Sequence, residues 1–329
     1  MPDAARRPSG RRYSSLLGSV LLAATLLVSL LTVASQQTPA SGAASTSQSA
    51  DASAPVRLRD CRQLPWCTPS FLGWELRRAV LLHRKQRAKR LANRLIRSQY
   101  PNGRWGLGTA WGRHEIDFKT RLASDAESWE VAEVALTLLD YDQRLGSARA
   151  RHSAERAAQY LRARVIRLGD HAYMAHMPDC NNLLQPHSTL AAAALLHHFP
   201  RHRRLAKRMK RSAVAMRWRR ISPRSGETSL RHWQWATPVN DYERIQSAFY
   251  LDAMGDRSGR RLLQQFGPKQ RLDIPRAQAY AVLVDLSLGK RHRARKRVRH
   301  LSFRPAKGYD LALTGWINTA RRQSAAAPQ

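Results

Sequence analysis

The chain has 329 residues, and its 57 Lys and Arg against 23 Asp and Glu give a formal net charge of +34. This length allows one large domain or two small ones with a buried core. A charge of this size repels itself, so it argues against purely neutral partners and implies an anionic partner or surface. Many of the arginines can also simply coat solvated helix faces.

The first 35 residues have the pattern of a membrane-targeting segment. Residues 1–14 form a basic cytoplasmic tail, and residues 15–35 are uncharged and mostly apolar. The apolar stretch approaches the roughly 20 residues of a membrane-spanning helix, which favours a signal anchor, while a cleaved signal peptide stays open. Because flanking arginines stay in the cytoplasm, we expect an inner-membrane anchor with the following domain periplasmic or extracellular, or secreted after cleavage.

The next residues predict a tether and a disulfide. Residues 36–56 are rich in Ser, Ala, Gln and Thr and lack large apolar side chains, which is typical of a flexible linker. Cys61 and Cys67 follow at a spacing that allows a disulfide in an oxidising compartment. Cys180 has no assigned role.

From about residue 73 the pattern is helical, and residues 75–99 predict one amphipathic helix with a basic face. Two kinds of helix follow each other. The basic amphipathic ones are 81–98, 149–167, 203–220 and 289–301, and the short apolar ones are 128–140, 188–199, 246–254 and 277–288. Strand-like alternation is scarce, so we predict an all-α domain over residues 57–321 and a disordered tail over 322–329.

The alternation of the two kinds of helix predicts how they pack. A helix that is apolar all round is buried, and a helix with one charged face lies outside. Alternating outer and inner helices form stacked helical hairpins in a ring or solenoid. The expected fold is therefore an α/α toroid or partial toroid behind an N-terminal transmembrane segment.

A short motif indicates how two hairpins join. Residues 97–108 read RSQYPNGRWGLG, so Gln99, Gly103 and Trp105 follow the pattern Gln-x-x-x-Gly-x-Trp. This pattern resembles the repeat of triterpene cyclases and related α/α toroids of the prenyltransferase type. In that family the glutamine caps a helix end and the tryptophan stacks on it, which implies structural roles here. The family's Asp-rich acid motif is absent from the sequence, which argues against cyclisation.

Three loops that precede apolar helices carry residues suited to sugar chemistry. Flat aromatic rings stack on pyranose faces, and carboxylates supply the acid and the base. Acidic residues at helix starts also serve as caps, and tryptophans also fill cores. The acid–base candidates are Asp125, Glu127, His187, Asp241, Tyr242 and Glu243, and the substrate-binding candidates are Trp111, Asn182, Arg231, Trp233 and Trp235.

The middle loop also contains zinc-type ligands. His171, His176 and Cys180 precede His187 at spacings that match no tight zinc signature. We therefore expect no metal and no other cofactor, and these residues are the weak candidates for a metal.

A second, weaker resemblance is to α/α-toroid polysaccharide lyases. These enzymes neutralise a uronate with Asn or Arg and use His and Tyr as base and acid, which implies Asn182, His187, Arg231 and Tyr242 here. The family's contiguous Asn-His pair is missing from this sequence.

Three functions are consistent with these features. The first is an exported enzyme, a lyase, hydrolase or epimerase, that acts on an anionic envelope or extracellular glycan. The second is a non-catalytic envelope protein that binds anionic lipid or polymer, and the third is a terpenoid-handling toroid. Nucleic acid is not an expected partner in vivo, because the domain is predicted to lie across the membrane, although this charge binds it in vitro.

Overall fold

The computed structural model describes residues 68–106, 126–177, 183–222, 234–272, 274–301 and 309–325. All of them belong to the compact unit Ala50–Gln329, and none to the unit Met1–Ser49. The predicted anchor at 15–35, the linker at 36–56, and both Cys61 and Cys67 lie outside the described residues. Within the described ranges, no helix is both long and apolar enough to span a bilayer.

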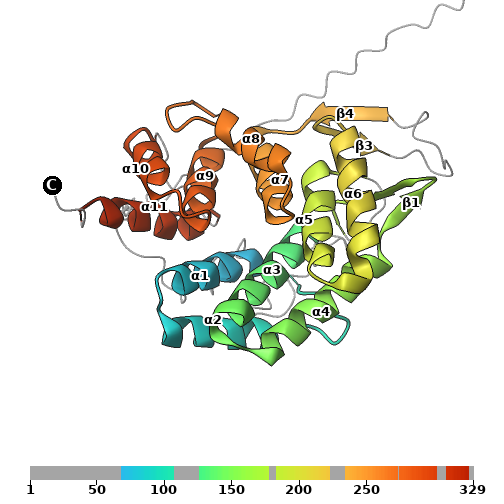
Figure 1. Cartoon of the computed structure of the whole chain (residues 1–329), viewed down its shortest axis with the longest axis horizontal. Helices are drawn as coiled ribbons and strands as arrows, with labels where there is room; N and C mark the ends of the chain where they lie inside the picture. The colour runs from blue at the N-terminus through green and yellow to red at the C-terminus, as the bar shows by residue number, and fades with distance from the viewer. Residues whose placement is uncertain are drawn as a thin grey trace, which may run out of the picture. The chain divides into compact units, whose positions relative to one another are not determined.

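The described residues form eleven α-helices, coloured in chain order in Figure 1. The odd-numbered helices are α1 (Pro69–Leu81), α3 (Ser128–Leu145), α5 (Pro186–His197), α7 (Asp241–Ala253), α9 (Pro275–Ser287) and α11 (Tyr309–Ala325). The even-numbered helices are α2 (Lys85–Arg97), α4 (Ala148–Ala163), α6 (Arg203–Ala215), α8 (Arg257–Gln265) and α10 (Arg291–Arg299). Helix α11 continues past residue 321, where the domain was expected to end.

The packing of these helices closes a ring. Each odd-numbered helix packs on the next odd-numbered one, and α11 returns to α1. Each even-numbered helix forms a hairpin with the odd-numbered helix that precedes it and packs on its outer side, as Figure 1 shows. This arrangement confirms the expected α/α-toroid class.

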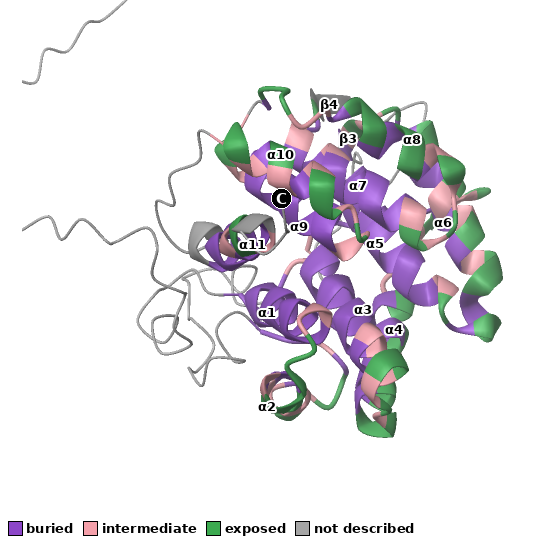
Figure 2. Ribbon diagram, turned by 60° about the vertical axis from the view of Figure 1, so that its left-hand side comes forward, coloured by how far each residue is buried: buried purple, intermediate pink, exposed green. Residues whose placement is uncertain are grey.

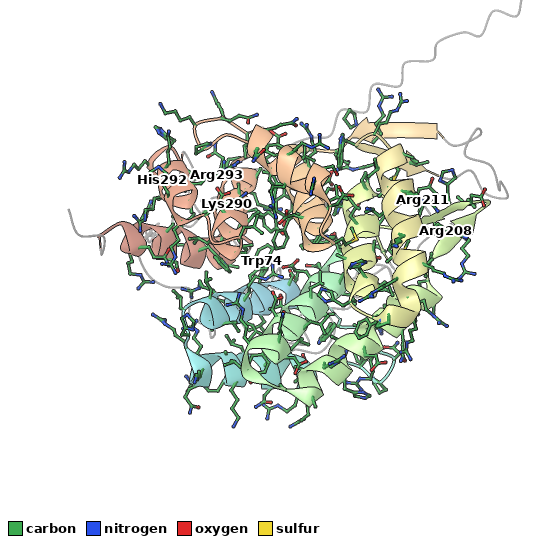
Figure 3. All side chains as sticks on the ribbon, viewed as in Figure 1. Trp74, Arg208, Arg211, Lys290, His292 and Arg293 are labelled. Atoms are coloured by element: carbon green, nitrogen blue, oxygen red, sulfur yellow. The ribbon has the colours of Figure 1, made fainter. Side chains whose placement is uncertain are left out.

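Burial follows the two kinds of helix predicted from the sequence. In Figure 2 the inner helices are mostly purple and the outer helices turn green faces to solvent. From Pro186 to Leu196, every residue of α5 is buried, whereas α2 buries only Ala88, Leu91, Ala92 and Leu95. In Figure 3, Arg208 and Arg211 lie on α6 and His292 lies on α10, away from the centre where Trp74 lies. The positive charge is thus concentrated on the outer helices.

The predicted single helix over residues 75–99 is wrong. The chain turns between α1 and α2, where His83 has a φ of 54°. No Gly or Pro marks this turn in the sequence. Because of the turn, α1 joins the inner ring, and Arg77 and Arg78 are buried although their residue type predicts an exposed face.

Two small antiparallel sheets lie in the connections from α4 to α5 and from α6 to α7. One pairs β1 (Ile166–Leu168) with β2 (His171–Tyr173), with Ile166 opposite Tyr173. The other pairs β3 (Arg219–Ser222) with β4 (Gln234–Pro238). A further bridge joins Leu184 to Ile221. The strands are too short for a clear alternating pattern, and they connect the segments that lead into α5 and α7.

Gln99 joins the first two hairpins through its side-chain amide. Its Nε2 donates to the carbonyl oxygens of Gly103 and Ser153, both at 2.9 Å. Its Oε1 accepts from Ser153 Oγ and from an Arg156 guanidinium nitrogen, both at 2.6 Å. The amide therefore links the end of α2 to the middle of α4.

Trp105 anchors the turn that follows Gln99. Its ring is fully buried, and its Nε1 donates to the carbonyl oxygen of Leu95 in α2 at 2.9 Å. Gly103 sits between the two residues with a φ of +95°, where a Cβ would come within 2.3 Å of the Arg156 carbonyl oxygen. Only glycine fits this close approach of the turn to α4.

Candidate functional site

The N-terminal ends of the inner helices gather at one end of the ring. Ser70 near the start of α1 donates to Glu130 Oε1 in α3 at 3.0 Å. The ring of Trp129 in α3 contacts Tyr242 at the start of α7. The Arg276 guanidinium at the start of α9 lies 5.9 Å from the centroid of the Tyr242 ring. Side chains that are far apart in the sequence therefore meet at one place.

Glu127 lies at this place as the residue that precedes α3. Its Oε2 accepts a short hydrogen bond from Trp129 Nε1, and its Oε1 lies 3.4 Å from His176 Nε2. The backbone N–H of Glu127 donates to Glu130 Oε2 at 3.1 Å, as in a capping box. With 28% of its side chain exposed, Glu127 combines fixed geometry with access from solvent.

Burial has a strong effect on the two glutamates at the start of α3. It raises the pKa of Glu127 to about 7, and the negative charge of Glu243 adds to this while the Trp129 hydrogen bond and Arg276 oppose it. Burial likewise raises the pKa of Glu130 to about 7, with a further contribution from the charge of Glu127. The two neighbouring carboxyl groups are thus poorly solvated as anions.

Two histidines complete the group around Glu127. His176 Nδ1 is 2.8 Å from Gln185 Oε1, the side chain of the residue that precedes α5. His187 in the first turn of α5 is 2% exposed, and its ring contacts that of Trp129. Burial lowers the pKa of both histidines, that of His187 well below its ordinary value. Both imidazoles are therefore held in their neutral form.

Glu243 occupies the position in α7 that Glu130 occupies in α3, the third residue of the helix, opposite its N-cap residue Asn240. Its backbone N–H donates to Asn240 Oδ1 at 2.9 Å, and its Oε2 accepts from the Asn240 N–H at 3.3 Å. Its Oε1 accepts from an Arg220 guanidinium nitrogen at 2.6 Å. Glu243 therefore caps its helix and forms an ion pair, while its charge still acts on Glu127.

Aromatic rings form the floor of the site. Trp74 contacts Trp129 and Tyr280, and Tyr280 packs edge-on against Tyr242 with centroids 5.0 Å apart. Trp74 and Tyr280 are fully buried, and Trp129 is 3% exposed. Because these rings are buried and pack against one another, they support the polar groups of the site but cannot stack on a sugar.

The structure brings some of the expected residues together and not others. Glu127, His187, Tyr242 and Glu243 belong to the group, whereas Asp241 pairs with Arg244 of its own helix at 3.3 Å. His171 stacks on Tyr173 in the β1–β2 sheet. Trp235 lies in β4. Asp125, Trp111, Asn182, Arg231, Trp233 and Cys180 lie outside the described residues, as does the side chain of Trp235.

The sequence did not indicate Glu130, Arg220, Arg276 or Gln185 as members of the site. Glu130 had a local signal, because an acidic residue three positions after a cap is the mark of a capping box. Arg220 and Arg276 had none, since they are two arginines among many. Their contacts depend on how β3 and α9 pack beside α7.

Comparisons with known proteins give similarity of fold. No protein-family model and no curated protein matches the sequence. The structure is similar to a novel alpha-amylase from Clostridium perfringens, with a TM-score of 0.53 and 10% identity over 78% of this chain and 86% of that one.

Two endoglucanase structures also match. An endoglucanase of glycosyl hydrolase family 8 from Klebsiella pneumoniae has a TM-score of 0.49 and 13% identity over 78% of this chain and 91% of that one. A family 8 endo-beta-1,4-glucanase from an Achatina fulica gut metagenomic library has a TM-score of 0.49 and 13% identity over 77% of this chain and 88% of that one.

Proposed function

We propose that this protein is a carbohydrate-active enzyme that hydrolyses glycosidic bonds of an anionic glycan. The observation that carries the proposal is the setting of Glu127. One of its oxygens is held by Trp129, the other lies 3.4 Å from His176, and the side chain is 28% exposed where the inner helices begin. A carboxylic acid that is fixed and reachable can donate a proton to the leaving oxygen of a sugar.

Glu243 has a supporting role in this proposal. It is bound to Arg220 and to its own helix start, so it contributes negative charge near the developing cation of the sugar ring. Hydrolysis also needs a carboxylate that takes a proton from water as a general base. Asp125, two residues before Glu127 in the sequence, is our candidate for this role. The similar alpha-amylase acts on carbohydrate by its name, and this supports the same class of substrate.

An anionic substrate is favoured by the charges around the site. Arg220 and Arg276 act electrostatically on the His176, His187 and Glu127 group. The ends of helices that meet here are N-terminal ends, which carry partial positive charge. The net charge of +34 would concentrate a polyanion near the protein.

We also propose that the domain works outside the cytoplasm, tethered through residues 15–35. Anionic polysaccharide or the anionic membrane surface would then contact the basic outer helices. A groove along α2, lined by Arg87, Arg90, Leu91, Asn93, Arg94 and Arg97, is one such surface.

The test is release of reducing ends from a polyuronate, with starch and a β-glucan as neutral comparisons. We expect the wild type to cleave the polyuronate and Glu127→Gln to lose about 10²–10⁴-fold in kcat with an unchanged melting temperature. Glu243→Gln should lower both activity and melting temperature, because it loses the ion pair with Arg220.

Asp252→Asn is the matched control, because Asp252 lies at the other end of α7 and pairs with Arg260. It should retain activity. Binding of the polyuronate without cleavage would support the non-catalytic alternative. An unsaturated uronate product would show that the reaction is an elimination and not a hydrolysis. Full activity of Glu127→Gln would rule out the proposed acid.

A further inference from the structure

Glu127, His176 and His187 each present one ligand atom to a common point. These atoms all lie within 4.8 Å of one another, and the residues come from the start of α3, the segment after β2 and the first turn of α5. We propose that this group binds a divalent transition-metal ion, with Zn²⁺ as the best-matched probe. The proposal goes beyond the proposed function and does not depend on it.

The ligand types and one measured separation fit zinc. Two imidazoles and one carboxylate form a common set in zinc sites that leave a fourth position open. Metal–ligand bonds of about 2.1 Å at a tetrahedral angle place two ligand atoms about 3.4 Å apart. The distance between His176 Nε2 and Glu127 Oε1 is 3.4 Å, long for a hydrogen bond but suited to two ligands of one ion.

Neighbouring side chains orient two of the three ligands as a metal requires. The Gln185 Oε1 can only accept, so it assigns the His176 proton to Nδ1 and leaves a lone pair on Nε2. Trp129 Nε1 donates to Glu127 Oε2, which leaves Oε1 as the atom nearest His176. Such outer hydrogen bonds accompany metal-binding histidines and carboxylates.

The third ligand has an unsatisfied ring nitrogen. His187 is 2% exposed, and its Nδ1 has no hydrogen-bond partner within the described part of the chain. A buried polar atom without a partner destabilises the protein, so its presence here points to a ligand that the described side chains do not supply. The candidate His171 stands apart from the group, where it stacks on Tyr173.

Metal binding would have one consequence for the proposed reaction. An ion bound to Glu127 Oε1 occupies the lone pair that would carry the transferable proton. Zinc should therefore inhibit glycan cleavage, and a chelator should restore it. This consequence alone rests on the proposed function.

The experiment measures binding without any substrate. Calorimetric titration of the whole chain with Zn²⁺ should give about one tight equivalent, as expected for a single three-ligand site. His176→Ala and His187→Ala should each weaken that equivalent by more than about 100-fold, and Gln185→Ala by about 10–100-fold through lost orientation of His176. His171→Ala is the matched control and should bind as the wild type does.

Two further measurements test the site if the alanine variants fold poorly, and they distinguish it from a site that contains cysteine. Glu127→Gln keeps the shape of the side chain, so a folded Glu127→Gln protein that binds Zn²⁺ less tightly supports the site. Co²⁺ in place of Zn²⁺ should give visible tetrahedral bands without a thiolate charge-transfer band. Unchanged Zn²⁺ affinity in His187→Ala and Glu127→Gln, or a thiolate band, would overturn the proposal. If the wild type binds no Zn²⁺ and Glu127→Gln still loses glycan cleavage, the metal site is refuted and the proposed function is supported.

Discussion

At the scale of single residues, the fold depends on a few side chains that form several contacts at once. Gln99 uses both ends of its amide to join α2 to α4, and Trp105 closes the same turn from within the core. Together with Ser98, Trp105 satisfies the Leu95 carbonyl oxygen, one of those at the end of α2 that lack a partner within the helix. The residue between them, Gly103, has no side chain because none fits.

Gly103→Ala should be strongly destabilising. The added Cβ would meet the Arg156 carbonyl oxygen at 2.3 Å, so α4 must move away from the turn. We expect a loss of at least about 3 kcal/mol in the free energy of unfolding, measured with urea.

Gly146→Ala serves as the control for Gly103→Ala. Gly146 also has a positive φ, of +65°, but nothing lies within 4 Å of its added Cβ. The left-handed conformation alone costs about 1–2 kcal/mol. Equal losses in the two variants would show that the contact with α4 contributes nothing.

At the scale of helices, buried polar contacts set how inner helices meet. Arg77 of α1 donates to Glu133 Oε1 of α3 at 2.7 Å, and Tyr250 of α7 donates to Glu133 Oε2 at 2.9 Å. Burial lowers the pKa of Arg77, but the charges of Glu133 and Asp140 outweigh burial and raise it above its ordinary value. Glu133 therefore joins three inner helices through its two carboxylate oxygens.

Glu133→Gln should cost about 3–5 kcal/mol, because it leaves the buried Arg77 without its strongest counter-charge. Glutamine retains an oxygen that can accept from Tyr250, so the loss reports mainly on charge. In the double variant Arg77→Met with Glu133→Gln, the unpaired charge is gone and stability should partly return. A double-mutant cycle from urea unfolding measures this coupling, and strictly additive losses would contradict it.

The contact between α6 and α8 should depend on acidity. Asp256 accepts from Lys210 Nζ at 2.7 Å and from the Ser258 N–H at the start of α8. The Lys210 hydrogen bond is the main cause that lowers the pKa of Asp256 from 3.8 to about 2. A lowered pKa means that the contact stabilises the protein above about pH 4 and that this contribution is lost as the pH falls towards 2.

Asp256→Asn should remove that contribution. Its melting temperature should lie below that of the wild type at pH 5, and the difference should shrink as the pH falls. Lys210→Met should behave in the same way, because it removes the other member of the pair. A difference that stays constant from neutral to strongly acidic pH would show that the ion pair has no effect.

At the scale of the whole described unit, charge and chemistry occupy different places. The inner helices carry the group around Glu127 at their N-terminal ends, and the outer helices carry most exposed Lys and Arg. In Figure 3, Arg208 and Arg211 of α6 and His292 of α10 lie on such outer helices. An enzyme for a long anionic polymer would benefit from both features, because the outer charge attracts the polymer that the site cleaves.

The predicted topology places every residue after the apolar segment outside the cytoplasm. A reporter that is active only in an oxidising compartment should therefore work when fused after residue 60, because residues 15–35 follow an arginine-rich tail. Replacing the arginines of residues 1–14 by glutamate should reduce the signal. Activity only from a cytoplasmic reporter would contradict the prediction.

The sequence predicted some residues of the candidate site but not their contacts with one another. Glu127, His187, Tyr242 and Glu243 stand at starts of apolar helices, and that position alone marked them in the sequence. A capping role for Glu243 could be read from its position, but its ion pair with Arg220 and the contact of His176 with Glu127 could not be predicted. Both involve residues separated by many positions, and their meeting depends on short strands that have too few residues to show a pattern.

The sequence by itself determined the alternation of outer and inner helices. Apolar residues all round a helix require burial, and a basic face requires solvent, so local composition was enough to assign the helices α2 through α7, α9 and α10 to a layer. It also determined the turn at Gly103, where glycine is needed.

Only the tertiary structure decided that α1 belongs inside the ring and that α11 closes it against α1. A turn at His83 without glycine or proline leaves no local signal, and the burial of Arg77 becomes favourable only when Glu133 of another helix is beside it. Ring closure and the group around Glu127 both arise from contacts between segments that are far apart in the sequence. The free energy of such a contact depends on both segments, so neither segment alone predicts it.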